Sequence, residues 1–386
     1  MASLLITADR MILTPAGGPH RVVSPGYVRV ADGVIAEAGE GRPQGAPDVH
    51  LPDGLLAPGL VDLQVNGYFG HDMVDADEAA WHTVVSRLPE TGVTAFLPTF
   101  ITAPVRTQAE ALRRTRDLLP GLPAGTRVLG VHLEGPFLSE KRKGAHNAAH
   151  LTDPLPGDIE TLLETGLVKL VTLAPERNGA LEAIRTLTAA GVLVSVGHSD
   201  ATAAQVAAAA DAGARKVTHI FNAQTGVHHR DPGVAVQALI DERLSPGLIL
   251  DLHHVAPEVA TLVFRAAAGR VVLVTDAASA AGMPPGAYDL GGEPITMPEQ
   301  GPPLRADGTI AGSGLRLDEA VGNAIALGVG AAAAVDAVTR IPADLVGRPD
   351  LGRIAPGAAA DLVWLGPDHR AHATWVNGQE VFGGGS

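Results

Sequence analysis

Short apolar segments recur along the middle of the chain, separated by stretches rich in alanine, leucine and glutamate. The apolar segments have the length and the β-branched content of strands, whereas the stretches between them have helical character. Eight such segments occur, at residues 60–65, 93–97, 127–133, 168–173, 192–196, 216–221, 247–252 and 271–275. Eight strands alternating with helices are what a (β/α)8 barrel requires, so the pattern predicts this α/β fold.

One intervening stretch shows the helical signal well: residues 201–212 are rich in alanine and follow Asp200, which we expect to be the N-cap. A doubly wound open sheet would have the same alternation of strands and helices. It loses support because no GxGxxG or P-loop pattern follows the first apolar segment.

The two ends of the chain show a different pattern, in which short strands are broken by turn residues. Strands are predicted at Leu4–Ile6, Met11–Leu13, Tyr27–Val30, Val34–Glu37, Asp361–Leu365, Ala373–Val376 and Glu380–Phe382. The pairs Asp32-Gly33 and Asn377-Gly378 are hairpin-turn signals. We therefore predict that residues 1–57 and 351–386 pair into one small β-sandwich beside a barrel of residues 58–350.

Composition narrows the possible chemistry. The 386 residues include no cysteine, which excludes disulfides, thiolate metal ligands and a thiol nucleophile, but they include 15 histidines. A net charge of −14 opposes nucleic-acid binding. No apolar run reaches the roughly 18 residues that a membrane helix needs. The N-terminus lacks the basic region of a secretory signal, so we expect a cytoplasmic protein.

Polar residues stand where the predicted barrel strands end. They are Gln64, Asn66, His132, Glu134, His198, His219, Asn222, His253, His254 and Asp276. In a barrel, catalytic groups collect at the C-terminal ends of the strands. Each of these residues taken singly is more often structural than functional, but buried carboxylates are costly unless they are paired or bind a metal. One carboxylate with two imidazoles is a familiar zinc set that leaves one position open, so the group predicts a metal site.

Five motifs carry a resemblance to a known family. They are His132–Phe137 (HLEGPF), Lys143–Asn147 (KGAHN), Gly197–Ser199 (GHS), Thr218–Ala223 (THIFNA) and Thr275–Ala277 (TDA). In this order, over nearly the whole chain, they resemble the N-acetylglucosamine-6-phosphate deacetylases of the amidohydrolase superfamily. The resemblance implies that Glu134, His198 and His219 bind one divalent metal per subunit, expected to be Zn²⁺. It also implies hydrolysis of the sugar's acetamide to glucosamine 6-phosphate and acetate.

A single metal is predicted because the first strand lacks the usual second site. Many amidohydrolases carry His-x-His there, whereas this chain has Gln64 and Asn66, and neutral amides are poor zinc ligands. No lysine stands at a strand end to be carboxylated as a bridge between two metals. His132 lies on the same strand face as Glu134 and is expected to support the site without binding the metal.

The resemblance also implies roles for other residues. Asp276 would take a proton from the attacking water and deliver it to the sugar nitrogen, and His146 would help to stabilise the oxyanion. The implied substrate contacts are Ala145, His146, Asn222, Ala223, Arg230, His254, Ile310, Ala311 and Gly312. The family further suggests a homodimer in which Arg230 reaches toward a partner's site; as an alternative, Arg230 forms a salt bridge with Asp231.

Two departures from the family pattern leave the substrate open. The family commonly has methionine where this chain has Gln224-Thr225, and Asp-Gly-x-His where this chain has Asp251-Leu252-His253-His254. Alternative substrates are therefore N-acetylgalactosamine 6-phosphate and an N-acyl amino acid. A metal-free barrel that has lost catalysis is the alternative of another class, and the retained metal and aspartate residues argue against it.

Overall fold

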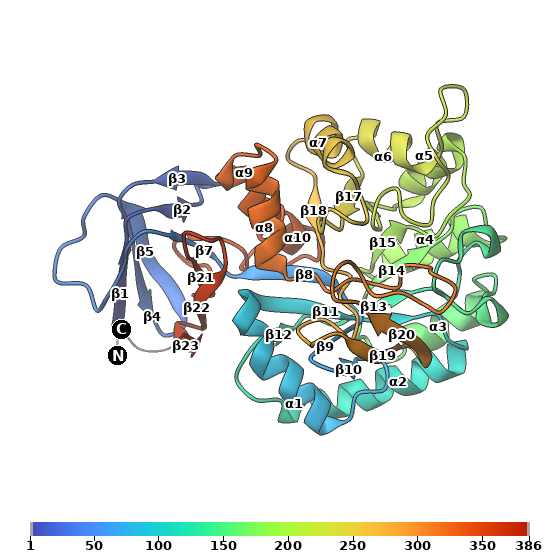
Figure 1. Ribbon diagram of the computed structural model, residues 1–386, viewed down its shortest axis with the longest axis horizontal. Helices are drawn as coiled ribbons and strands as arrows, with labels where there is room; N and C mark the ends of the chain where they lie inside the picture. Colours follow the sequence, from blue (N-terminus) through green and yellow to red (C-terminus); the bar gives the residue numbers. More distant parts are fainter. Residues whose placement is uncertain (1–2, 384–386) are drawn as a thin grey trace.

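The computed structural model describes residues 3–383, which form a barrel of parallel strands beside a separate pair of sheets (Figure 1). The barrel strands are β8 (Leu60–Val65), β11 (Val93–Ile101), β13 (Val131–Glu134), β14 (Val168–Leu173), β15 (Leu193–Val196), β16 (Lys216–Val217), β17 (Ser245–Leu248) and β18 (Val272–Leu273). Neighbouring strands pair in parallel in this order. The predicted (β/α)8 barrel is therefore confirmed.

The barrel closes between its first and last strands. The backbone N–H of Asp276, just after β18, donates to the carbonyl of Gln64 at 2.9 Å, and the N–H of Asn66 donates to Ala277 O at 2.9 Å. An open doubly wound sheet would leave these edges apart. The closure bonds therefore exclude that alternative and bring the ends of β8 and β18 together.

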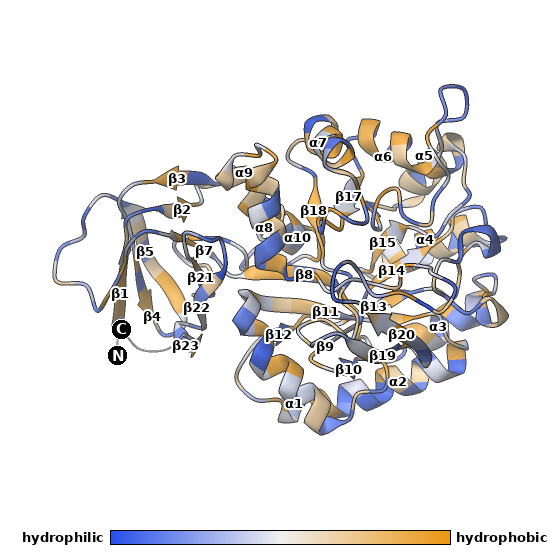
Figure 2. Cartoon of the chain, in the orientation of Figure 1, coloured by the Kyte–Doolittle hydropathy of each residue, from blue (hydrophilic) through white to orange (hydrophobic). Residues whose placement is uncertain are grey.

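Helices cover the outside of the barrel. They are α1 (Glu78–Arg87), α2 (Val105–Leu118), α3 (Pro156–Leu163), α4 (Ala180–Ala189), α5 (Ala203–Ala212), α6 (Gly233–Ile240), α7 (Pro257–Ala266), α8 (Leu317–Ala326), α9 (Ala331–Asp336) and α10 (Arg340–Leu345). Figure 2 shows apolar colour along β8 and β18 and mixed colours along α1 and α2. Apart from Lys169 on β14, the residues of these barrel strands are buried, as in other parallel sheets under helices. Within residues 3–383, no helix is long and apolar enough to cross a membrane.

The chain termini build two further sheets. One has the strand order β5 (Val34–Glu40), β4 (Gly26–Ala31), β1 (Ser3–Ala8), β6 (Val49–Leu51). The other has the order β23 (Gln379–Phe382), β22 (Ala371–Val376), β21 (Leu362–Leu365), β7 (Leu55–Pro58), β2 (Met11–Leu13), β3 (Arg21–Val23). β21 and β7 pair antiparallel, which joins the two ends of the chain. The predicted pairing of the termini is thus confirmed, and Ile6, Leu56 and Trp375 belong to its core.

Several predicted element boundaries were wrong for local reasons. The segment 127–133 is broken at Gly130, whose φ of 135° suits glycine, into β12 (Arg127–Val128) and β13. Helix α5 begins two residues later than predicted, because Thr202 rather than Asp200 is the N-cap and forms a capping box with Gln205.

The barrel strands predicted at 192–196, 216–221, 247–252 and 271–275 are also shorter than or offset from their predicted ranges, since β16 and β18 each span only two residues and β17 begins two residues early. Two hairpins were not predicted from the hydrophobic pattern. They are β9 (Gly67–Tyr68) with β10 (His71–Asp72), and β19 (Gly286–Leu290) with β20 (Glu293–Met297). The second hairpin packs Leu290 and Ile295 in a small apolar cluster with Ile101.

A buried ion pair between Arg127 and Asp361 is among those that join the barrel to the terminal sheets. Arg127 donates to both oxygens of Asp361 at 2.7 and 2.9 Å, and the Asp361 side chain is only 2% exposed. Removing one partner from such a pair leaves a buried charge without compensation.

We expect the substitution Arg127→Met to lower the free energy of unfolding by about 2 kcal/mol, because the Asp361 carboxylate would lose two charge-assisted hydrogen bonds. Urea unfolding measures this change. The matched control is Arg113→Met, since Arg113 pairs with the exposed Glu164 and such pairs contribute about 0.5 kcal/mol or less. Equal losses for the two variants would contradict the prediction.

Candidate metal and active site

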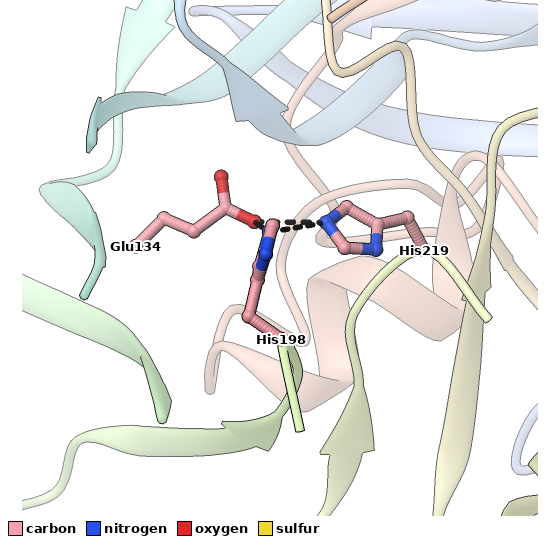
Figure 3. Close-up of side chains that lie close together, drawn as sticks. All are labelled: Glu134, His198 and His219. Atoms are coloured by element: carbon pink, nitrogen blue, oxygen red, sulfur yellow. Dashed lines mark hydrogen bonds and ion pairs between the residues drawn. The ribbon is translucent and has the colours of Figure 1, made fainter. Parts of the chain in front are cut away.

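Three side chains from neighbouring barrel strands point toward one another (Figure 3). Glu134 is the last residue of β13, and His198 and His219 lie just beyond β15 and β16. The Nε2 atoms of His198 and His219 lie 3.2 and 3.0 Å from Glu134 Oε1 and 3.0 Å from each other. All three side chains are buried. The three residues therefore lie together, as the sequence analysis predicted.

The three atoms fit a divalent metal. Ligands on a tetrahedral zinc at about 2.0–2.1 Å lie roughly 3.3 Å apart, close to the observed spacing. The Nδ1 of His198 lies 2.9 Å from the carbonyl oxygen of Arg142, which can only accept, so the ring proton is on Nδ1 and the lone pair of Nε2 faces His219. Facing nitrogens beside a carboxylate oxygen are stabilised by a cation between them. The donor set, two imidazoles and one carboxylate, is that of a zinc site with one open position.

The charges of the triad depend on one another. Burial alone would raise the pKa of Glu134, but the hydrogen bonds with His198 and His219 outweigh burial and hold that pKa well below its usual value. Burial opposes protonation of His219, yet the hydrogen bond to Glu134 and its negative charge leave the pKa of His219 raised. Glu134 therefore remains an anion and attracts positive charge to this point.

The backbone is strained where it presents these residues. The φ angles of His198, His219 and Asp276 are 46°, 28° and 51°, all in the left-handed region that residues with a side chain rarely adopt. Such strain costs on the order of 1–3 kcal/mol per residue and is typical of functional sites. The turns that end these strands therefore aim the side chains over the barrel mouth.

Asp276 lies beside the triad and is held by the side-chain amides of Gln64 and Asn66. Gln64 Nε2 and Asn66 Nδ2 donate to Asp276 Oδ1 at 3.0 and 2.7 Å, and Gln64 Nε2 also lies 3.2 Å from Glu134 Oε1. Burial raises the pKa of Asp276, as does the nearby charge of Glu134. Among the described residues Asp276 Oδ2 has no hydrogen bond, which leaves one oxygen for proton transfer.

His146 is buried next to the triad, with its ring centre 4.3 Å from that of His198. The backbone N–H of Thr102 donates to His146 Nδ1 at 3.3 Å, and the Thr102 hydroxyl lies 2.8 Å from the same nitrogen. With Nδ1 accepting from both groups, the neutral ring carries its proton on Nε2. Burial holds the pKa of His146 well below its usual value. The ring is therefore a neutral N–H donor.

These residues surround a cavity of about 370 Å³ at the mouth of the barrel. Most of the predicted contact residues line it, namely Ala145, His146, Asn222, Ala223, His254, Ile310 and Gly312. Two predicted residues do not. Ala311 is completely buried, so its side chain packs among Ile101 and Leu290 instead of facing the cavity. Arg230 lies in the exposed segment 226–231 and does not line this chain's cavity.

The alternative for Arg230, an ion pair with Asp231, is not formed within residues 3–383. A backbone bridge between His228 and Asp231 shapes the loop instead. Several further residues line the cavity that were not predicted from the sequence, including Lys141, Arg142, Ile249, Leu290 and Thr309. Lys141 and Arg142 directly precede the KGAHN motif, and both pair with Asp200 at 2.9 Å. Their position next to this motif is the feature of the sequence from which a place in the cavity could have been predicted.

His132 does not bind at the metal position. Its Nδ1 lies 3.2 Å from Thr99 Oγ1 and its Nε2 lies 2.8 Å from Thr172 Oγ1, so neither nitrogen is free. Thr172 in turn hydrogen-bonds Thr218 at 2.7 Å. His132 thus belongs to a buried hydrogen-bonded chain across the barrel, and its burial lowers its pKa to about 3.

The two departures from the family pattern differ in their surroundings. Gln224 is buried, and its amide accepts from Phe221 N at 3.1 Å and donates to Thr218 O at 2.9 Å. It therefore braces the turn that contains His219. His253 is exposed and does not line the cavity.

Comparison with known proteins agrees with the barrel fold and with a metal site at Glu134, His198 and His219. The chain belongs to the amidohydrolase family of metal-dependent hydrolases, whose model matches residues 55–381. The predicted family is thereby confirmed.

Individual relatives carry more specific names than the family does. N-acetylgalactosamine-6-phosphate deacetylase of Escherichia coli O157:H7 is 38% identical over 356 residues, covering 91% of this chain and 93% of the relative. N-acetylglucosamine-6-phosphate deacetylase of Bacillus subtilis is 37% identical over 331 residues, covering 83% and 82%. Among solved structures, a variant of the Mycobacterium smegmatis N-acetyl-D-glucosamine-6-phosphate deacetylase in complex with N-acetyl-D-glucosamine-6-phosphate aligns with a TM-score of 0.93 and 33% identity. That alignment covers 99% of this chain and 100% of the other.

We expect His198→Ala and His219→Ala to lose bound metal, because each removes one of three converging ligand atoms. His132→Gln should retain it, since both ring nitrogens of His132 are engaged by threonines. Elemental analysis after dialysis measures the metal per chain. A His132 variant as depleted as the other two would show that the triad is assigned wrongly.

Proposed function

We propose that this protein hydrolyses the acetamide of N-acetylglucosamine 6-phosphate, giving glucosamine 6-phosphate and acetate. The observation that carries the proposal is the meeting of the triad, the free oxygen of Asp276 and the N–H of His146 in one cavity. A nucleophile, a proton carrier and an oxyanion donor are what amide hydrolysis needs.

Glu134, His198 and His219 would hold one divalent metal, and their nitrogen and oxygen donors suit Zn²⁺. Such an ion supplies Lewis acidity and lowers the pKa of a water toward about 7. Asp276 then accepts the proton of the attacking water on Oδ2 and delivers it to the departing nitrogen. Its raised pKa suits both steps, because a base near neutrality can also act as an acid.

His146 would donate from Nε2 to the carbonyl oxygen as negative charge develops there. A neutral donor held by Thr102 needs no reorganisation during the reaction, and one such donor contributes roughly 3 kcal/mol in comparable sites. Asn222, the backbone of Ala223, and the loop residues Ile310 and Gly312 would contact the sugar from the cavity wall.

The phosphate would be met by cationic and donor groups that line the cavity. His254 lines the cavity, with its Nδ1 held 2.7 Å from Asp251 Oδ2, so Nε2 is available to the ligand. Lys141 and Arg142 line it as well. Arg230 would contribute only if its exposed loop entered the cavity of a second subunit, so its proposed role requires a homodimer. We propose a cytoplasmic location, in keeping with a phosphorylated substrate.

N-acetylgalactosamine 6-phosphate is the second candidate substrate. The observation in its favour is the Escherichia coli relative, which acts on that sugar by its name and covers 91% of this chain. The two sugars differ only in the orientation of one hydroxyl group. An N-acyl amino acid is less well matched, because it lacks the phosphate that the cationic residues would bind.

We expect rapid acetate release from N-acetylglucosamine 6-phosphate and at least about 100-fold lower kcat/KM on the sugar without phosphate, since charge-assisted hydrogen bonds would be lost. The assay also includes N-acetylgalactosamine 6-phosphate and an N-acetyl amino acid. Equal rates on phosphorylated and unphosphorylated sugar would rule out the phosphate assignment. No release from any of the four, with metal bound, would indicate a scaffold.

We expect Asp276→Asn to lower kcat by at least about 10³-fold, because an amide cannot carry the proton, while the metal content stays unchanged. Acetate release and elemental analysis on the same sample separate the two effects. Asp289→Asn, on the β19–β20 hairpin and outside the cavity lining, is the matched control. Substantial turnover by the Asp276 variant would exclude Asp276 as the proton carrier.

A further inference from the structure

Lys216 is a fully buried lysine that the reaction proposed above does not use. It begins β16, three residues before His219. The other lysines, Lys141, Lys143 and Lys169, are exposed. Within the part of the chain that the structure describes, Lys216 Nζ has no hydrogen-bond partner.

The ammonium lies inside the barrel. A Cβ atom at Gly247, on the neighbouring strand β17, would lie 2.7 Å from Lys216 Nζ. Gly247 is two residues before Ile249, which directly follows β17 and lines the cavity. Lys216 therefore occupies interior space that the glycine leaves free.

A buried ammonium without hydrogen bonds is costly, so its presence calls for a compensating interaction. Burial lowers the pKa of Lys216 to about 8, while the charges of Glu134, Asp276 and Asp62 act in the opposite direction. A lysine with this pKa is mostly protonated at pH 7. The interior thus contains a cation that its carboxylates help to keep charged.

Asp62 on β8 is the third carboxylate of the interior. It is buried, and it accepts from Thr275 Oγ1 at 2.6 Å and from the backbone N–H of Gln64 at 3.1 Å. Burial raises the pKa of Asp62 to about 7, while these hydrogen bonds act in the opposite direction, so the carboxyl group is ionised in part at pH 7. With Asp62 ionised, three carboxylates lie in this interior, whereas a single divalent ion compensates only two negative charges.

We propose that Lys216 supplies the remaining positive charge, so that one divalent ion and one ammonium together balance Asp62, Glu134 and Asp276. Because Gln64 and Asn66 are neutral, no second metal ion would provide that charge. Lys216 is a positioning residue that acts through Glu134 and Asp276. The inference rests on the metal site proposed above.

The charge of Lys216 has a measurable effect on metal binding. An ammonium inside the barrel repels a divalent cation, so its removal strengthens metal binding. We expect Lys216→Met and Lys216→Gln to bind Zn²⁺ roughly tenfold or more tightly than the unchanged protein. Lys216→Arg, which retains the charge, should keep the original affinity.

The experiment is a competition of the full-length protein with a chelator for Zn²⁺ at pH 7, with circular dichroism to verify folding. Lys169→Met is the matched control, because Lys169 lies on barrel strand β14 but is exposed, and its affinity should not change. Unchanged or weaker binding by folded Lys216→Met or Lys216→Gln would overturn the inference. If the unchanged protein itself bound no Zn²⁺, the proposed metal site would fail instead.

Discussion

The closure of the barrel between β8 and the segment after β18 is the constraint on which the site depends. Two backbone hydrogen bonds at this seam fix Gln64 and Asn66 against Asp276, more than 200 residues away in the chain. The same seam brings Gln64 within hydrogen-bonding distance of Glu134, so Asp276, the proposed proton carrier, and Glu134 of the proposed metal site accept from the same amide. A shift in the pairing of β8 with the segment after β18 would displace Asp276 and Glu134 together, because the register of strand pairing determines where the side chains at the strand ends lie.

Much of this arrangement could be predicted from the sequence, and the reasons are local. Strands buried on both faces are continuous apolar runs, so β8 and β14 were predicted at their observed bounds. Polar residues directly after such runs identified the triad and Asp276, because strand ends meet at one barrel mouth. The turn pairs Asp32-Gly33 and Asn377-Gly378 were also correct, since both residues of each pair adopt positive φ.

Other features of the site depend on tertiary contacts, which the local pattern of hydrophobic and polar residues does not indicate. The roles of Gln64 and Asn66 as donors to Asp276 follow from barrel closure and not from their own strand. The β19–β20 hairpin has an irregular polar pattern, and its burial against Ile101 is a tertiary effect. Arg230 was grouped with the cavity by resemblance alone, whereas the exposed residues 226–231 of its loop do not line this chain's own cavity.

The left-handed backbone at His198, His219 and Asp276 bears on how such a chain could change over time. At these positions glycine would relieve strain, so stability alone would favour losing all three side chains. A lineage freed from catalysis would therefore drift toward glycine or asparagine there, and would gain stability as it did so. Two imidazoles and one carboxylate held at unfavourable φ angles therefore lower the stability of the fold while they place the side chains of the site.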